Sequence, residues 1–350
     1  MLEDYFPVGK DAFTQLYQIT STNANVGIYV NQDFPTFDLP GRYDRYYISW
    51  LEHINIPWLL KQAELVYPKP ILVANETENF DPVLLDMFPD NIEFIWWNTW
   101  GMQIDLSRQH AGIADDPAPA KYKISSLAHR YSQYKKFVTA FLLEHFDHND
   151  LILSWHNWVA KDSDLHGHPA GFKHIDSLNF GLLNEKIQLN FSDTFVNNPI
   201  NNTEWKGGPG DLAVVTLTNE SYHYSKTVIN NTEVVLPSPY LTEKTWKPLL
   251  SAKPFVIIGG CYGLQELNTL GIRTDFGWID EYDTDPGDLT RINKIFDTLL
   301  DINTRTAEQL YEESLPAVTH NLQHIKSGGL LDACEQINAP TREIIRDFVS

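Results

Sequence analysis

Three consecutive residues combine a hydroxyl, a carboxylate and an ammonium group: Thr242, Glu243 and Lys244. They open a short helical pattern over 242–252, and an apolar run over 254–260 predicts a buried strand directly after it. A cation at a helix start suits a phosphate group, because the N–H groups and the helix dipole favour an anion there. A carboxylate on the same rim suits a ribose, since it accepts hydrogen bonds from hydroxyls. This chemistry fits a nucleotide diphosphate.

Further polar side chains lie where other predicted strands end. In open α/β sheets ligands bind beyond the carboxyl ends of the strands, so these residues are candidates for the same site. Arg130 and Lys135 both fit the diphosphate, since each donates charge-assisted hydrogen bonds, and the sequence does not choose between them. The residues at these strand ends are His129, Arg130, Lys135 and Glu220.

The same charges also fit an ordinary helix start. In that interpretation Thr242 is the N-cap, Glu243 complements the helix dipole and Lys244 is solvated. Arg130 and Lys135 equally fit a solvated surface. The sequence leaves both interpretations open.

The elements that must position these residues alternate between strands and helices, which predicts an α/β fold with parallel sheets. A stretch over 111–121 rich in Ala, Pro and Asp separates two such series. We therefore expect two Rossmann-like domains facing a cleft, over 1–118 and 119–350. Strands are expected over 25–34, 70–76, 91–99, 121–130, 150–155, 211–221 and 254–260. Helices are expected over 46–63 around Pro57, and over 82–88, 134–146, 242–252, 262–271, 288–302 and 304–327.

The segment YLTEKTWKPLLSAKPFVIIGG resembles the signature of the fucosyltransferase-like glycosyltransferases. That signature is an aromatic and an aliphatic residue, Thr-Glu-Lys, a helix, a small residue, and Pro-hydrophobic-Val leading to a glycine. The core resembles the YLTEKTFKP-type core of viral and environmental members. The resemblance extends roughly over 120–300, and its strong part is about 20 residues long. The matching residues are Tyr240, Leu241, Thr242, Glu243, Lys244, Trp246, Pro254, Val256 and Gly259.

The resemblance implies a GT-B-like fold in which the carboxyl-terminal domain mainly holds the sugar nucleotide. Lys244 and Arg130 would neutralise the diphosphate, and Glu243 would bind the ribose. The implied reaction moves a sugar from a nucleoside diphosphate sugar, with a guanosine diphosphate sugar as the first candidate, to a glycan or another hydroxyl acceptor. We expect inversion at the sugar carbon, and neither a metal nor a further cofactor.

An inverting transfer needs a carboxylate that deprotonates the acceptor hydroxyl. Loops of the first half offer Asp33, Glu76, Glu78 and Asp105. Glu76 and Glu78 are the candidate bases, because they lie at the end of the strand expected over 70–76. Ordinary solvated loop carboxylates are the alternative explanation for both.

Four histidines lie close together in sequence, at 156, 166, 168 and 174. Their segment has no cysteine and no helical His-x-x-x-His spacing, so no metal site is predicted there.

Composition limits the remaining possibilities. A net charge of −20 disfavours nucleic acid as a partner. No apolar run approaches about 18 residues, so no membrane span is expected. The two cysteines are far apart and the first residues do not form a signal peptide, which favours the cytoplasm, including that of a virus-infected host cell. The alternatives to an enzyme are a non-catalytic protein that binds sugar nucleotides or glycans, and a viral interaction protein that reuses the fold.

Overall fold

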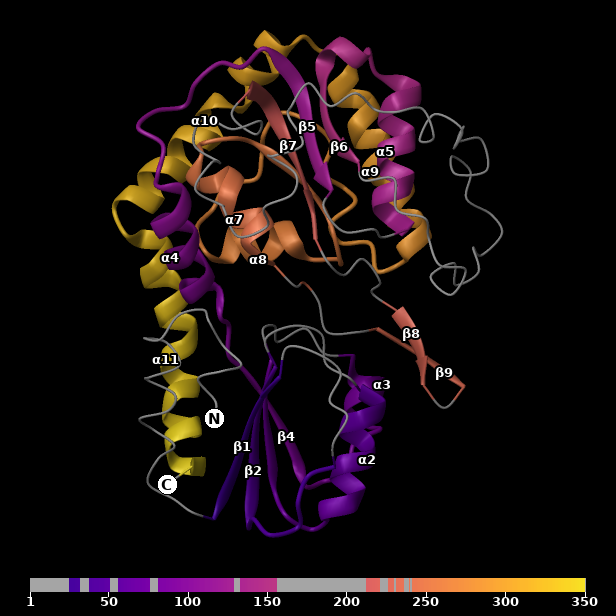
Figure 1. The fold of residues 1–350 in the computed structure, drawn as a ribbon, viewed down its shortest axis with the longest axis vertical. Coiled ribbons are helices and arrows are strands. Elements are labelled where there is room, and N and C mark those ends of the chain that lie inside the picture. The colour runs from indigo at the N-terminus through magenta and orange to yellow at the C-terminus, as the bar shows by residue number, and fades with distance from the viewer. Residues whose placement is uncertain are drawn as a thin grey trace. The chain divides into compact units, whose positions relative to one another are not determined.

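The computed structural model describes residues 25–31, 38–50, 56–75, 81–128, 133–155, 212–220, 226–229, 231–235, 239 and 241–349. The chain is an α/β protein whose main sheets are parallel, as predicted (Figure 1). It divides into two compact units. Unit 1 comprises Met1–Leu106, Ser225–Tyr240 and Leu331–Ser350, and unit 2 comprises Ser107–Tyr224 and Leu241–Leu330.

These units differ from the predicted domains 1–118 and 119–350. The first crossing between units lies at 106/107, inside helix α4 (Trp100–Ala111), and two later segments return to unit 1. The loop predicted over 111–121 is present, because the chain is irregular between Ala111 and the next strand. This loop belongs to unit 2, so it does not separate the two units. A crossing inside a continuous helix carries no turn residues, so sequence reasoning had nothing to detect there.

Unit 1 contains a four-stranded sheet in the order β1-β2-β3-β4, with every neighbouring pair parallel. Its central strands are buried on both faces, and all five residues of β3 are buried. Such strands form where aliphatic and aromatic residues run continuously along the chain. The strands are β1 (Val26–Asn31), β2 (Arg45–Trp50), β3 (Ile71–Asn75) and β4 (Ile92–Trp96).

The helix predicted over 46–63 is wrong in its first half. Residues 46–50 belong to strand β2, and helix α2 (Ile56–Val66) begins only beside Pro57. Tyr46 and Tyr47 are fully buried, and aromatic side chains of this kind favour a central strand. Proline is tolerated in the first helical turn, because the N–H that it lacks would have no partner there, and Pro57 accordingly lies at the start of α2.

Helices cover both faces of this sheet. On one face α2 and the short α3 (Pro82–Leu85) pack against a core that includes Ile48 and Val73. On the other face Ile345 of α11 (Gly329–Val349) packs with Tyr47 and Leu72. Helix α11 was not predicted. Its pattern contains Pro340, and an internal proline normally argues against a continuous helix.

An antiparallel hairpin, β8 (Lys226–Ile229) and β9 (Thr232–Val235), also belongs to unit 1. Ile229 and Val234 join the same core as α2 and α3. One carboxylate oxygen of Asp81 caps α3 by accepting from Val83 N at 2.9 Å, and the other accepts from Val235 N at 2.8 Å. The hairpin was missed, although two asparagines between two β-rich runs are a known hairpin signal.

Unit 2 contains a second parallel sheet in the order β10-β7-β5-β6, and all four strands were predicted. From β5 the next strand in sequence, β6, lies on one side, whereas β7 and then β10 lie on the other. The strand order therefore reverses between β5 and β7, which is where open α/β sheets bind ligands. The strands are β5 (Tyr122–Ala128), β6 (Leu151–Trp155), β7 (Ala213–Asn219) and β10 (Phe255–Ile258).

Five helices and a single 3-10 turn complete the described part of unit 2 (Figure 1). Helices α5 and α9 pack together, with the rings of Phe141 and Phe296 stacked at 4.1 Å, and α7 packs against α10. The elements are α5 (Gln133–His145), η1 (His148–Asp150), α7 (Glu243–Leu250), α8 (Gly263–Thr269), α9 (Asp288–Asn303) and α10 (Ala307–Lys326).

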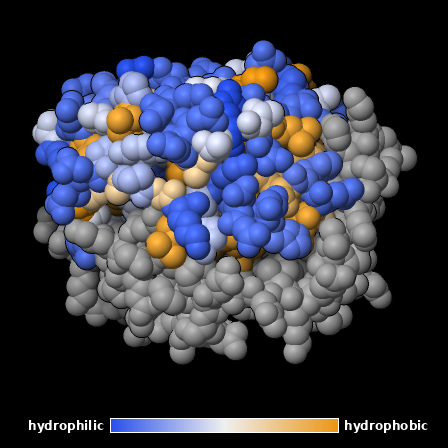
Figure 2. Space-filling model, turned by 90° about the horizontal axis from the view of Figure 1, so that it is seen from above, coloured by the Kyte–Doolittle hydropathy of each residue, from blue (hydrophilic) through white to orange (hydrophobic). Residues whose placement is uncertain are grey.

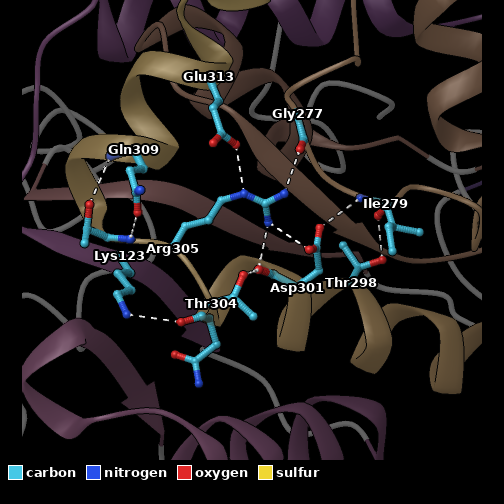
Figure 3. A network of polar contacts seen from close by, with 11 residues as sticks. Lys123, Gly277, Ile279, Thr298, Asp301, Thr304, Arg305, Gln309 and Glu313 are labelled. Atoms are coloured by element: carbon cyan, nitrogen blue, oxygen red, sulfur yellow. Dashed lines mark hydrogen bonds and ion pairs between the residues drawn. The ribbon is translucent and has the colours of Figure 1, made fainter.

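A polar network fixes the turn between α9 and α10 (Figure 3). The guanidinium of Arg305 pairs with Asp301 at 3.0 Å and with Glu313 at 2.8 Å, and it donates to Gly277 O at 3.1 Å. A planar guanidinium suits this task because it can serve several acceptors at once. The network ties the turn to the loop that follows α8.

Where Figure 2 colours the surface by hydropathy, it is mostly hydrophilic, with hydrophobic residues scattered in small groups. Among the described residues, no helix combines the length and the apolar character that crossing a membrane requires.

Candidate functional site

The candidate site lies at the carboxyl edge of the unit 2 sheet, beside the reversal of strand order. Strand β7 ends at Asn219, and the next residue, Glu220, donates its N–H to Ile258 O of β10 at 2.9 Å. Helix α7 begins at the same edge, and its first residues are those singled out in the sequence. We call Glu220, Thr242, Lys244 and Thr245 the β7–α7 corner.

Glu220 is the centre of this corner. Its side chain is 1% exposed, and three donors surround its carboxylate. Oε1 accepts from Thr242 N at 3.1 Å and from Thr245 Oγ1 at 2.6 Å, whereas Oε2 accepts from Thr242 Oγ1 at 2.5 Å. A carboxylate at a helix start is favoured by the helix dipole and by charge-assisted hydrogen bonds. Glu220 therefore holds the start of α7 on the end of β7.

Thr242 is the N-cap of α7, as the helix-start interpretation predicted. Its hydroxyl donates to Glu220, and it accepts from Lys244 N at 3.4 Å and from Lys244 Nζ at 3.0 Å. A threonine hydroxyl has one proton to donate and two lone pairs, so all of its hydrogen-bonding capacity is used. The cap and the glutamate thus act as one unit.

Lys244 is the partly exposed cation of the corner. Its side chain is 29% exposed, and Nζ lies 3.9 Å from Glu220 Oε2 in addition to its contact with Thr242. Because the ammonium carries three donors and is held above the helix start, an anion arriving from solvent meets a cation of fixed position. Glu243 is the first residue of α7, and its side chain lies outside the described part.

The end of β10 forms the neighbouring wall. A Cβ added to Gly259 would lie only 3.3 Å from Glu220 Cβ. The glycine therefore allows the end of β10 to lie this close to the residue that follows β7. Arg291 of α9 is 2% exposed, and its Nε donates to Gly259 O at 3.0 Å. The same guanidinium also donates to Asp285 O and pairs with Asp288 at 2.8 Å.

Sequence reasoning missed Arg291, although a signal existed. The buried stripe of α9 continues from Arg291 through Ile295 and Leu299, so the arginine occupies an apolar position of an amphipathic helix. A charge at such a position requires partners inside the protein.

A second helix start at this edge also holds a carboxylate of the chain itself. Asp283 accepts from Leu264 N at 2.8 Å and from Gln265 N at 3.0 Å in the first turn of α8. Burial raises the pKa of Asp283 to about 6, against the opposite effect of these two hydrogen bonds and of the Arg291 charge. Carboxylates of the chain itself, Glu220 and Asp283, therefore occupy the starts of α7 and α8. At the β7–α7 corner, Lys244 is the partly exposed charged group.

Strands β5 and β7 are linked by a buried polar contact where the strand order reverses. Asn219 Nδ2 donates to Ser126 Oγ at 3.0 Å, and both side chains are buried. Among the described residues the amide oxygen of Asn219 has no partner.

The remaining predicted site residues are only partly placed. Lys135 lies in the first turn of α5 and is 6% exposed, so it is not the solvated surface residue of the alternative interpretation. His129, Arg130, Glu76 and Glu78 lie outside the described residues. The four clustered histidines at 156, 166, 168 and 174 also lie outside them. In the described ranges no group of three or more His, Cys, Asp or Glu side chains is placed to hold a metal ion.

Comparisons with known proteins add no further assignment. The chain matches no protein-family model, no curated protein and no solved structure.

Proposed function

We propose that this protein is a glycosyltransferase, with two Rossmann-like domains of the GT-B type and the sugar nucleotide bound at the β7–α7 corner of unit 2. One observation carries the proposal. The Thr-Glu-Lys sequence that resembles the fucosyltransferase-like signature starts a helix at the carboxyl edge of a parallel sheet, beside the reversal of strand order. At that place its lysine is partly exposed.

Each residue of the corner has a role in this proposal. Lys244 neutralises the diphosphate, while Glu220 and Thr242 hold the lysine and the helix start in place. Glu243 binds the ribose hydroxyls, and Arg130 or Lys135 supplies the second cation. Stabilising the leaving diphosphate lowers the barrier to sugar transfer, because negative charge develops on its oxygen as the sugar–phosphate bond breaks.

The acceptor hydroxyl loses its proton to a carboxylate as its oxygen forms the new bond to the sugar carbon. Attack from the face opposite the leaving diphosphate inverts that carbon. Glu76 and Glu78, which follow β3 in unit 1, remain the proposed bases. The donor is a nucleoside diphosphate sugar, with the guanosine compound first, and the acceptor is a glycan or another hydroxyl compound. No metal and no further cofactor are needed in this scheme.

Calorimetric titration with GDP, UDP, CMP and ADP tests the donor site. We expect one nucleotide to bind the wild type, and Lys244→Ala to weaken it by about ten- to a hundredfold, since a hydrogen bond to a charged group contributes roughly 1.5–3 kcal/mol. Lys247→Ala is the matched control, because it removes the same charge from the last turn of the same helix. If no nucleotide binds, or if both variants bind as the wild type does, the proposal fails.

A non-catalytic protein that binds sugar nucleotides is the second candidate. It requires the donor site of the corner but no base in unit 1, and the carboxylate of Glu220 is itself engaged by three donors of the chain. Release of free sugar from the matching donor, or its transfer to an added glycoside, distinguishes an enzyme from this alternative.

A further inference from the structure

A second group of buried polar side chains lies at the carboxyl edge of the unit 1 sheet. Asn75 ends strand β3, whereas Asn98 and Thr99 connect β4 to α4. The backbone joins them, because Trp97 N donates to Asn75 O at 2.8 Å. Their exposed fractions are 0%, 2% and 9%, and all three side chains are uncharged. We call these three residues the β4–α4 corner.

The main chain of Asn98 is held by helix α11. Asn98 N donates to Asn338 Oδ1 at 3.0 Å, and Asn98 O accepts from Asn338 Nδ2 at 2.9 Å. Thr341, one turn further along α11, donates to Trp96 O at 2.7 Å. The amide of Asn338 thus satisfies both backbone groups of Asn98, and the Asn98 side chain takes no part in this anchoring.

The side chain of Asn98 is buried, yet neither Nδ2 nor Oδ1 has a hydrogen-bond partner within the described ranges. Because both polar atoms are unpartnered, the conclusion is the same whichever way the amide is turned. An asparagine amide can donate two hydrogen bonds and accept two, and its burial without any of them is unfavourable. Native proteins keep such groups rarely, and each one requires an explanation, such as a catalytic role or a bound water or ion.

The neighbouring helix start supplies further donors. Asn98 lies two residues before Trp100, the first residue of a helix of 12 residues. Thr99 O accepts the first helical hydrogen bond, from Gln103 N at 3.1 Å, so the N–H groups of the first turn face out of the helix at this corner. These donors, together with an amide that both donates and accepts, match a ligand with adjacent hydroxyls. None of the three side chains of the corner carries a charge that would pair with an ionic ligand, so we expect a neutral one.

We propose that the β4–α4 corner binds a neutral, hydroxyl-rich ligand such as a sugar residue, with the Asn98 amide bridging two of its hydroxyls. The binding site stands on the geometry of unit 1 alone. Its role as the acceptor subsite of a transferase rests on the proposed function.

The test compares two asparagines of unit 1 that flank the same strand. Asn98→Leu removes the unpartnered amide with little change in volume. Asn91→Leu is the matched control, because Asn91 precedes β4 and its Nδ2 donates to Lys69 O at 2.9 Å and to Ala63 O at 3.3 Å. The probes are the methyl glycosides of glucose, galactose and mannose, and binding is followed by ligand-observed NMR and by the melting temperature of the protein.

We expect at least one glycoside to bind the wild type and Asn91→Leu equally. Asn98→Leu should weaken that binding by about tenfold or more, since two hydrogen bonds are lost. The melting temperature of Asn98→Leu should stay unchanged or rise, whereas that of Asn91→Leu should fall. The proposal is overturned if no glycoside binds the wild type, if Asn98→Leu binds like the wild type, or if its melting temperature falls as far as that of Asn91→Leu.

Hydrogen exchange of the wild type, measured with and without the glycoside, tests the site even if a variant does not fold. A bound glycoside should slow exchange in the first turn of α4 and leave α2 unchanged, and the opposite pattern contradicts the proposal. The nucleotide titration with the same samples separates the two proposals. If glycosides bind but no nucleotide does, the sugar site stands and the transferase fails. If a nucleotide binds but no glycoside does, only the sugar site fails.

Discussion

Replacement of Glu220 by glutamine preserves the shape of the side chain and tests why a carboxylate lies at the start of α7. All groups around the carboxylate are donors. Oε1 accepts from a backbone N–H and from the hydroxyl of Thr245, and Oε2 accepts from the hydroxyl of Thr242. A glutamine has only one oxygen, so its amide nitrogen must face one of these donors.

Neither orientation of the glutamine solves this problem. If the nitrogen replaces Oε1, it faces the N–H of Thr242, and a backbone donor cannot turn away. If the nitrogen replaces Oε2, the Thr242 hydroxyl must turn and give up a hydrogen bond from Lys244. At least one buried donor therefore loses its partner, which costs about 1–3 kcal/mol, and each remaining bond loses roughly 1 kcal/mol of charge assistance. Removing a buried charge offsets part of this, so we expect a net loss of about 2–4 kcal/mol.

Equilibrium urea unfolding measures the loss, and hydrogen exchange locates it. Exchange should accelerate in α7 and remain unchanged in β2 and β3 of unit 1. The control is Glu313→Gln, which alters an ion pair whose glutamate is 40% exposed and should cost less than about 1 kcal/mol. If Glu220→Gln loses no more stability than this control, or if exchange in α7 does not change, then the donors do not require a carboxylate and our reasoning is wrong.

Three further predictions concern charged side chains that the fold holds in fixed contacts. The pKa of Asp283 is about 6 in the folded chain and 3.8 ordinarily. As the pH rises through that interval, the free energy of unfolding of the wild type should therefore fall by up to about 3 kcal/mol relative to that of Asp283→Asn. Urea midpoints of the wild type that rise with pH relative to those of the variant would contradict this. Arg291→Met should cost about 3–5 kcal/mol in urea unfolding because it leaves Asp288 without its buried partner, and a loss below 1 kcal/mol would refute the role of the arginine. Asp81→Ala should lose about 1–2 kcal/mol with faster hydrogen exchange in β9. Asp81→Ser should keep the cap of α3 and lose less stability, with the same faster exchange in β9, because the bond to Val235 is lost in both variants; exchange in β9 as slow as in the wild type would separate the hairpin from Asp81.

The sequence was most informative about local structure in unit 2. Short, mostly apolar runs marked β6, β7 and β10, because a strand buried on both faces is rich in apolar residues. The start of α7 was also correctly placed, since Thr242 has the residue type and the position of an N-cap.

Contacts between distant segments were not predictable. Glu220 was visible as a polar residue at a strand end, but its bonds to Thr242 and Thr245 join residues more than 20 positions apart. Asn98 and Asn338 are separated by 240 positions, and two asparagines carry no pairing signal at any distance. Periodicity reports which face of an element is buried, whereas the partner of a buried polar group depends on the tertiary fold.

The helix α11 has a consequence for the order in which the chain acquires its structure. The strands of unit 1 are made before unit 2, but the face formed by Tyr47 and Leu72 is covered by Ile345 and Val349, which are made after it. During synthesis this apolar face remains uncovered until unit 2 and then α11 have been translated. Unit 2 needs nothing beyond Leu330 and can fold earlier. The strands of unit 1 therefore leave the ribosome before unit 2 but complete their core after it, and their apolar face is open to aggregation in that interval.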